Sequence, residues 1–438
     1  MNDLYQEIFK EIKKIPVIDT HEHLPSKEEN LNQGRDILNE YLSHYMSSDL
    51  ISAGLSNDSL NKIKDSSIPI LKRWEIVDPY WKFCRYTGYG RALDISVNKI
   101  YNVDSINRNT IEILNEKFKE KNRPGHFKYV LKDLCKIKLS ILDTWDSRFD
   151  CDQDLFRRVW QILNYIIPMP LEIPEEGLDI VSWLENEYDI SINSLDDWMH
   201  AFNIELVDNL NHGIIGIKNI LGYFRPLQFN KVDYNTAKNK FASDLRKWKE
   251  IDRKEGKNIR FSKDVQDFMM HYILKVINKK KLFMQVHTGL LEGNGDIITN
   301  SNPALMCNLF NDYPDVKFDI FHIGYPYYAE TSALGKMFPN AFIDMCWAHI
   351  ISPAASVQAL SDFIDAVPFN KISAFGGDYL FVDAIYGHLH IARRNVSKVL
   401  SQKVKENVFT VEKAIEIAWH LFYYNPVKIF DLEEKINN

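Results

Sequence analysis

Seven short apolar runs recur along this chain, and each reaches a polar or ionisable residue before a stretch with helical periodicity begins. They are VID (17–19), KIKLSILDTW (136–145), GIIGIK (213–218), KLFMQVH (281–287), VKFDIFH (316–322), NAFIDMCW (340–347) and KISAFGGD (371–378). A weaker run, NYIIPMP (164–170), fills a place between the second and third. Such runs are typical of parallel strands joined by crossover helices, and eight of these units close into an α/β (β/α)8 barrel, or TIM barrel.

The rival architecture is an open doubly wound sheet, which would carry a glycine-rich phosphate loop after its first strand. Here that place holds HEHLP (21–25). We therefore expect one barrel domain over residues 1–438. Residues 24–134 are too many for one crossover helix and predict a helical insertion that caps the barrel mouth, while 171–202 predict a smaller elaboration. The amphipathic segment 409–430 is expected to pack on the outside of the barrel.

Charge and composition argue against two classes of binding partner, nucleic acid and membranes. The formal net charge of -7 argues against nucleic acid, which requires clustered Lys and Arg. No run of about 18 uncharged apolar residues exists to cross a membrane. The five cysteines are odd in number and form no C-x-x-C, and the N-terminus has no apolar signal core. The sequence therefore predicts a cytoplasmic protein that acts on a small molecule.

The stretch HEH (21–23) predicts a metal site. Residues i and i+2 of a strand point to the same face, so His21 and His23 converge while Glu22 points away. Two imidazoles at this spacing can bind one metal ion, although H-x-H alone is a weak signal. His287, His322 and Asp378 strengthen the prediction of a metal site, because each ends a predicted strand where a metal ligand of a barrel would lie.

At these residues the sequence resembles the amidohydrolase superfamily of metal-dependent barrel enzymes. The resemblance rests on DTHEHLP (19–25), GIKNILGYFRP (216–226), QVHTG (285–289), FHIGYP (321–326) and FGGD (375–378). It is greatest for the amidohydrolase-related branch of type 2. The start HEHLPSKEEN (21–30) and the insertion after it are also similar to uronate isomerases of the same superfamily.

The resemblance implies a role for each strand end. It makes His21, His23 and His287 metal ligands, and Asp378 both a ligand and the acceptor of the proton of the attacking water. It makes His322 a ligand of a second metal or a group that polarises the substrate carbonyl. It places Lys218 at the position that some members carboxylate to bridge two metals. One ion is favoured, with two expected if Lys218 is carboxylated.

These residue types suit zinc, with manganese or iron as alternatives. The expected reaction is hydrolysis of a small polar amide, lactone or ester by water activated on the metal. Isomerisation of a sugar acid and metal-dependent decarboxylation stay open as alternatives, as does a barrel that binds metal without catalysis. Candidate substrate contacts are Arg225, which suits a carboxylate, Tyr223 and Trp347. A homo-oligomer is usual for such barrels.

Overall fold

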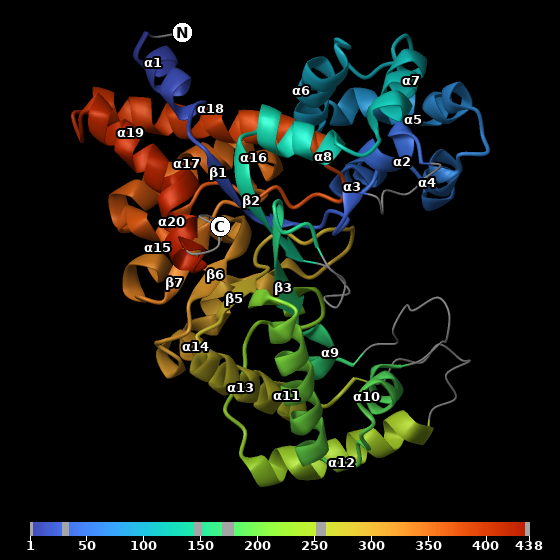
Figure 1. Cartoon of the computed structure of the whole chain (residues 1–438), viewed down its shortest axis with the longest axis vertical. Helices are drawn as coiled ribbons and strands as arrows, with labels where there is room; N and C mark the ends of the chain where they lie inside the picture. The colour runs from blue at the N-terminus through green and yellow to red at the C-terminus, as the bar shows by residue number, and fades with distance from the viewer. Residues whose placement is uncertain (1–2, 29–34, 144–150, 169–178, 251–259, 434–438) are drawn as a thin grey trace.

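The computed structural model describes residues 3–28, 35–143, 151–168, 179–250 and 260–433. Eight parallel strands pair in chain order (Figure 1). They are β1 (Val17–Glu22), β2 (Ile137–Asp143), β3 (Phe156–Gln161), β4 (Ile214–Asn219), β5 (Phe283–Val286), β6 (Phe318–Ile320), β7 (Ala341–Asp344) and β8 (Ile372–Ser373). Backbone hydrogen bonds from Thr20 to Phe375 and from Asp378 to His21 join the segment after β8 to β1. The predicted (β/α)8 barrel is confirmed.

Seven strands coincide with the predicted apolar runs, although β1 and β4 extend past the ends of theirs, and the third strand was misplaced. β3 lies at 156–161, whereas 163–166 form the short helix α9 (Leu163–Ile166). Residues 144–145 and 169–170 of the predicted runs lie outside the described residues. β3 reads FRRVWQ, and its two arginines hide the apolar pattern of a strand. Arg158 is nevertheless buried, because its guanidinium donates to the carbonyl of His212 at the start of the next strand.

Helices between the strands surround the barrel. α1 (Asp3–Ile12) precedes β1, and α18 (Asp383–Lys405) follows β8. The others are α11 (Leu195–Asn211), α12 (Tyr234–Glu250), α13 (Lys263–Lys280), α14 (Cys307–Asp312), α15 (Tyr328–Met337), α16 (Ala348–Ile351) and α17 (Pro353–Ala366). The second elaboration includes α10 (Ile180–Tyr188), while residues 171–178 lie outside the described part of the chain.

The long segment between β1 and β2 is helical. It contains α2 (Ile37–Tyr41), α3 (Tyr45–Ser52), α4 (Asn57–Lys64), α5 (Ile70–Cys84), α6 (Gly88–Tyr101), α7 (Ile111–Lys121) and α8 (His126–Lys128). These helices form a lobe at the upper right of Figure 1. α6 packs backbone to backbone on α18, because a Cβ at Gly387 would lie 1.9 Å from the carbonyl oxygen of Ala92.

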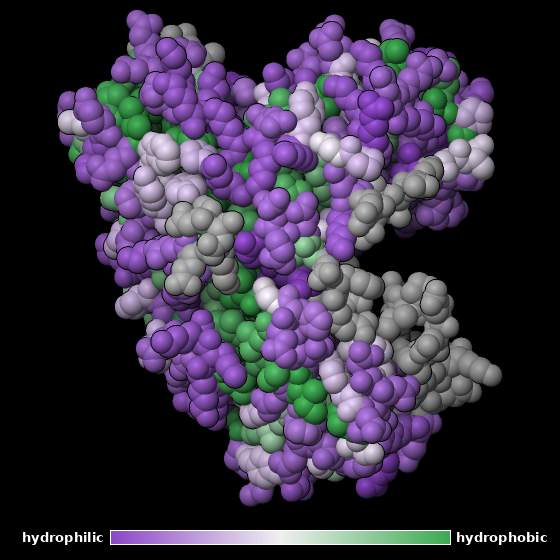
Figure 2. All heavy atoms as spheres, viewed as in Figure 1, coloured by the Kyte–Doolittle hydropathy of each residue, from purple (hydrophilic) through white to green (hydrophobic). Residues whose placement is uncertain are grey.

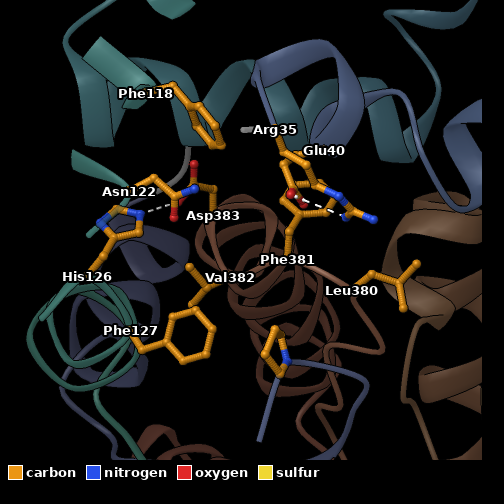
Figure 3. A pocket seen from close by; sticks show the side chains of 11 residues that line it. Arg35, Glu40, Phe118, Asn122, His126, Phe127, Leu380, Phe381, Val382 and Asp383 are labelled. Carbon is orange, nitrogen blue, oxygen red and sulfur yellow. Dashed lines mark hydrogen bonds and ion pairs between the residues drawn. The ribbon is translucent and has the colours of Figure 1, made fainter. Parts of the chain in front are cut away.

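Asp383, the first residue of α18, joins three helices of this lobe to the barrel. Its carboxylate accepts hydrogen bonds from the Tyr41 hydroxyl (2.8 Å), the Tyr101 hydroxyl (2.6 Å) and His126 Nε2 (2.6 Å). A pocket opens beside this cluster (Figure 3). Arg35 and Glu40, on another wall of the pocket, form an ion pair with each other. The charged groups of this pocket are therefore paired within the protein.

The barrel has an apolar floor at the amino ends of its strands. The C-terminal segment completes this floor, since Ile429, Phe430 and Leu432 cluster with side chains from β1 to β5. The rings of Phe283 and Phe430 lie 4.8 Å apart. The expectation of one outer helix over 409–430 is therefore corrected: α19 (Val411–Trp419) packs against α1 and α18, but α20 (Asn425–Ile429) leads the chain under the barrel.

The surface is indented between the lobe of α2–α7 and the part of the chain that carries α10 and α12 (Figure 2). No helix in the described ranges has the length and apolar character needed to cross a membrane. All five cysteines carry free thiols.

Candidate metal centre

The two histidines of HEH meet Asp378 at the mouth of the barrel. His21 lies in β1 and His23 directly follows it, with their ring centroids 4.8 Å apart. His23 Nε2 lies 3.2 Å from Asp378 Oδ1, and His21 Nε2 lies 3.9 Å from the same oxygen. Glu22 points elsewhere, because its Oε2 accepts the backbone N–H of Tyr379 (2.9 Å). The structure thus brings the two imidazoles together on one side of the strand.

Asp378 stands on a backbone that β1 holds in place. Its φ of 59° is rare for a residue with a side chain. Three successive N–H groups of this segment bind acceptors on β1: Gly377 N to Asp19 Oδ1 (2.9 Å), Asp378 N to His21 O (2.8 Å) and Tyr379 N to Glu22 Oε2 (2.9 Å). The position of the Asp378 carboxylate is thus fixed relative to both histidines of the same strand.

His287 and His322 extend the cluster from β5 and β6. His322 Nε2 lies 3.2 Å from His287 Nδ1 and 3.8 Å from Asp378 Oδ2. His322 has a φ of 60°, so the chain turns sharply where β6 ends and directs the ring into the mouth. All four predicted histidines and Asp378 therefore lie together at the carboxyl ends of the strands, where barrel enzymes carry their chemistry.

Each of the four histidines donates one ring N–H to an oxygen outside the cluster. The acceptors are Gln285 Oε1 for His21 Nδ1 (3.1 Å), Asp143 O for His23 Nδ1 (3.2 Å), Leu290 O for His287 Nε2 (2.9 Å) and Cys346 O for His322 Nδ1 (2.8 Å). A neutral imidazole that donates through one nitrogen has a lone pair on the other. His21, His23 and His322 thus present Nε2 lone pairs to the centre, and His287 presents Nδ1.

This donor set fits a divalent metal ion. Lone pairs of His287 and His322 that face each other across 3.2 Å repel unless a proton or cation lies between them. Ligand atoms of His21, His23 and Asp378 lie within 4.8 Å of one another, as do those of His322, Cys346 and Asp378. Histidine nitrogens with one carboxylate are the ligands that zinc accepts. The outer hydrogen bonds of the rings are those that metal-bound histidines usually make.

Protonation states agree with this fit for His21, His287, His322 and Asp378. His23 differs: burial alone would lower its pKa, but the hydrogen bond and charge of Asp378 outweigh burial and raise it. Burial lowers the pKa of His21 and of His287 well below the usual range, and lowers that of His322 to about 4. Burial alone would raise the pKa of Asp378, but the hydrogen bond and charge of His23 outweigh it, and the net pKa is well below the usual range. Neutral imidazoles and an ionised carboxylate are the forms that bind metal.

Lys218 is the penultimate residue of β4 and lies beneath the cluster. Its side chain is 1% exposed, and Nζ lies 3.3 Å from His21 Nε2 and 3.6 Å from the centroid of the Phe321 ring. Among the described residues no carboxylate comes within ion-pair distance of this ammonium group. Burial lowers the pKa of Lys218, which favours the neutral amine.

Aromatic residues wall one side of the mouth. Trp347 lies between His44 and Tyr45 of the inserted lobe, with ring centroids 4.9 and 4.3 Å away, and it is 1% exposed. Asn294, in the loop after β5, donates to the Ser48 carbonyl and ties that loop to α3. Tyr223 stands beside His287 at 4.8 Å between rings, and its hydroxyl accepts the N–H of Glu292.

Three of these neighbours were missed by sequence reasoning. His44 and Tyr45 belong to no sequence motif. They reach the mouth only because α3 packs on Trp347. Burial lowers the pKa of His44 to about 3. Asp143 ends β2 much as His287, His322 and Asp378 follow their strands, and this position in the sequence was the signal for it. Its Oδ2 lies 3.9 Å from His21 Nε2.

Arg225 is paired within the protein. Its guanidinium donates to Asp267 (2.6 Å), Gln266 (2.8 Å) and the carbonyl of Gln228 (2.7 Å), and it lies over the ring of Phe229. The side chain is 7% exposed. These partners on α13 and the adjoining loop give Arg225 a structural ion-pair role, and its contact with a substrate carboxylate stays a prediction.

Part of this sequence matches a known protein family. A family model described as amidohydrolase matches residues 256–410, which contain His287, His322 and Asp378. The resemblance to the amidohydrolase superfamily is confirmed. Protein fluG of Emericella nidulans is 26% identical to this amidohydrolase-like chain over 180 residues. That match covers 40% of the chain and 21% of the fluG protein, so the chain spans about a fifth of that relative.

Solved structures share the fold over the whole chain. A uronate isomerase from Thermotoga maritima has a TM-score of 0.79 at 18% identity, covering 98% of each chain. A protein described as a metal-dependent hydrolase, from Lactobacillus casei, has a TM-score of 0.66 at 15% identity, covering 99% of each chain. At these identities the likeness concerns the architecture, which includes the helical insertion.

Proposed function

We propose that this amidohydrolase-like barrel is a metal-dependent hydrolase of a small polar amide, lactone or ester. The observation that carries the proposal is the donor set: four imidazoles and the Asp378 carboxylate lie together at the barrel mouth, with Asp378 beside His21, His23 and His322, and His322 beside His287. His21, His23, His287 and Asp378 would hold the ion, zinc being the best match to these ligands. When bound, the ion would supply positive charge that stabilises a developing oxyanion.

Asp378 is the proton acceptor in this proposal. It is ionised, buried and oriented by its backbone, and Oδ1 and Oδ2 face different histidines. A carboxylate held in this way takes a proton from the attacking water and returns it to the leaving group. Tyr223, beside His287, would contact the substrate.

His322 fits the role of a ligand better than that of a polarising acid. Its Nδ1 proton is committed to the Cys346 carbonyl, so Nε2 has no hydrogen to donate to a substrate carbonyl. Its low pKa keeps the ring neutral near pH 7. A second ion held by His287 and His322 would require a bridging anion, which a carboxylated Lys218 would provide.

Metal analysis tests the centre first. We expect about one divalent ion per chain in protein purified without chelator, and none in His21→Ala/His23→Ala. Lys218→Met should retain this one ion if Lys218 is a plain amine. A fall from two ions to one in Lys218→Met would instead identify a bridging carbamate. Wild-type protein that stays metal-free after incubation with excess zinc would overturn the proposal.

Turnover in ¹⁸O-labelled water then tests the reaction. Hydrolysis of an amide, lactone or ester places one label in the product acid, and Asp378→Asn should abolish it while the protein stays folded. Metal-loaded protein that turns over none of these classes contradicts the hydrolase assignment.

Isomerisation of a sugar acid is the second candidate. It is supported by the whole-chain likeness to the Thermotoga maritima uronate isomerase. The buried Tyr45 hydroxyl and His44 ring at the mouth are suited to contact a polyhydroxylated substrate. Conversion of a uronate to a ketose, with no ¹⁸O incorporated into its carboxylate, would select this reaction.

A further inference from the structure

One buried carboxamide touches the candidate metal centre from below. Gln285 lies in β5, is 0% exposed, and contacts His21 and its strand neighbour. Its Nε2 donates to the carbonyl of Thr20 (2.9 Å) and to Asp319 Oδ2 (3.2 Å). Its Oε1 lies 3.1 Å from His21 Nδ1. All of these groups lie inside the barrel, out of contact with solvent.

The two acceptors determine which way the amide points. Thr20 O has no hydrogen, so the end of the carboxamide that faces it must be the NH2 group. A flipped amide would place Oε1 against the Thr20 carbonyl oxygen, where neither oxygen has a hydrogen, and the His21 ring could accept at most one of the two buried N–H groups. Buried polar groups left unpaired in this way are costly. Oε1 therefore faces His21, and it requires a hydrogen on Nδ1.

We propose that Gln285 is a positioning residue that fixes His21 in the Nδ1–H tautomer and thereby sets the metal affinity of the centre. This inference rests on the proposed metal site. With the hydrogen on Nδ1, the Nε2 lone pair of His21 faces the candidate metal centre, where Lys218 Nζ lies 3.3 Å and Asp378 Oδ1 3.9 Å from Nε2. With the hydrogen on Nε2, His21 would offer the metal no lone pair.

His21 is unusual among the four histidines because its orienting acceptor is a side chain. His23, His287 and His322 donate to backbone carbonyls, which no substitution removes. The tautomer of His21 can therefore be tested by mutation without changing a metal ligand. Outer partners of this kind typically contribute 10- to 100-fold to metal affinity.

The test compares two buried carboxamides. Gln285→Met keeps the length of the side chain and removes both ends of the amide. Asn340→Leu is the matched control: Asn340 is buried at the amino end of β7, and its amide donates to the carbonyls of Phe310 and Tyr313. The dissociation constant for zinc is measured by competition with a chromophoric chelator. We expect Gln285→Met to bind zinc roughly 10- to 100-fold more weakly and Asn340→Leu to match the wild type.

Equal zinc affinity of folded Gln285→Met and wild type would overturn the inference while leaving the metal site intact. Failure of the wild type to bind zinc would overturn the proposed function itself. The tautomer is also read directly, by ¹H–¹⁵N correlation of ¹⁵N-histidine-labelled, metal-free wild type, with His21 assigned from His21→Gln. A protonated Nδ1 supports the inference, and a protonated Nε2 contradicts it; this measurement stands even if Gln285→Met does not fold.

Discussion

Gly377 shows how closely one residue can be matched to its surroundings. A Cβ at this position would lie 1.7 Å from Glu22 Oε1 and 2.7 Å from the carbon of the same carboxyl group. Glu22 cannot swing away freely, since it is 0% exposed and its Oε2 holds the Tyr379 N–H. The second glycine of FGGD therefore makes room for the glutamate of HEH, and this contact sets the distance between two motifs that lie more than 350 residues apart in sequence.

Gly377→Ala should destabilise the protein and weaken its metal binding together. Overpacking of this kind typically costs about 1–3 kcal/mol, and the displaced loop carries Asp378. Urea unfolding and zinc titration measure the two effects. Gly377→Ala/Glu22→Ala should recover part of the stability, because it removes the atoms in the clash. If Gly377→Ala alone matches the wild type in both stability and zinc affinity, the proposed clash with Glu22 is contradicted.

The part of the site that the sequence could predict is the set of residues at the strand ends. Parallel strands must bring their carboxyl ends to one mouth, so His21, His23, His287, His322 and Asp378 had to meet once the strands were recognised. Contacts made by the inserted lobe follow no such rule. Trp347 was proposed as a substrate contact, yet the rings of His44 and Tyr45 cover it, and only the packing of α3 shows this.

At the scale of elements, strands were predictable where they are apolar and obscure where they bury charge. β3 escaped recognition because Arg157 and Arg158 interrupt it, and the apolar run after it forms α9. Arg225 was ambiguous for a related reason: its partner Asp267 lies on α13, 42 residues along the chain. Long-range pairing of a buried charge has no local signal in a single sequence.

Asp383 is the junction between the barrel and α2, α6 and α8. Removing one partner of a buried ion pair typically costs about 3–5 kcal/mol, so Asp383→Asn should lower the free energy of unfolding by an amount of that order. Glu416→Gln is the control, since Glu416 pairs with Lys413 and both side chains are about half exposed; its loss should cost under about 1 kcal/mol. Equal effects of the two substitutions in urea unfolding would remove Asp383 from this role.

The same junction should give stability a defined pH dependence. Burial alone would lower the pKa of His126, but the charge and hydrogen bond of Asp383 outweigh burial and raise it. The contribution of His126 to the free energy of unfolding is therefore complete at low pH. It is lost as the pH rises through the raised pKa. Burial alone would raise the pKa of Asp383, but His126 and the tyrosines lower it, so its contribution is lost only in acid. The difference in unfolding free energy between wild type and His126→Gln should peak near about pH 5–6 and shrink above neutrality. A difference that grows with pH would contradict this sign.

For the molecule as a whole, the two ends of the barrel divide stability from chemistry. The mouth gathers titratable groups whose partners are arranged for a cation, and the floor gathers apolar side chains beneath the strands. The C-terminal segment belongs to the floor: Lys317 donates to the carbonyls of Lys428 and Ile429 and pairs with Asp431, which holds Phe430 against Phe283. Removing a ring from the floor should therefore leave the mouth unchanged.

Phe430→Ala tests this division directly. Phe430 is 1% exposed, and loss of a buried phenylalanine typically costs about 3–5 kcal/mol. Zinc affinity of the folded fraction should stay at the wild-type value, because no metal ligand touches this ring. Gln285→Met should show the opposite balance, a large change in affinity for a smaller change in stability. Phe83→Ala controls for ring removal as such, since Phe83 is 64% exposed and its loss should cost under about 0.5 kcal/mol. If Phe430→Ala weakens zinc binding as much as Gln285→Met does, the floor and the mouth are mechanically coupled, and the metal site depends on the whole barrel rather than on its upper layer.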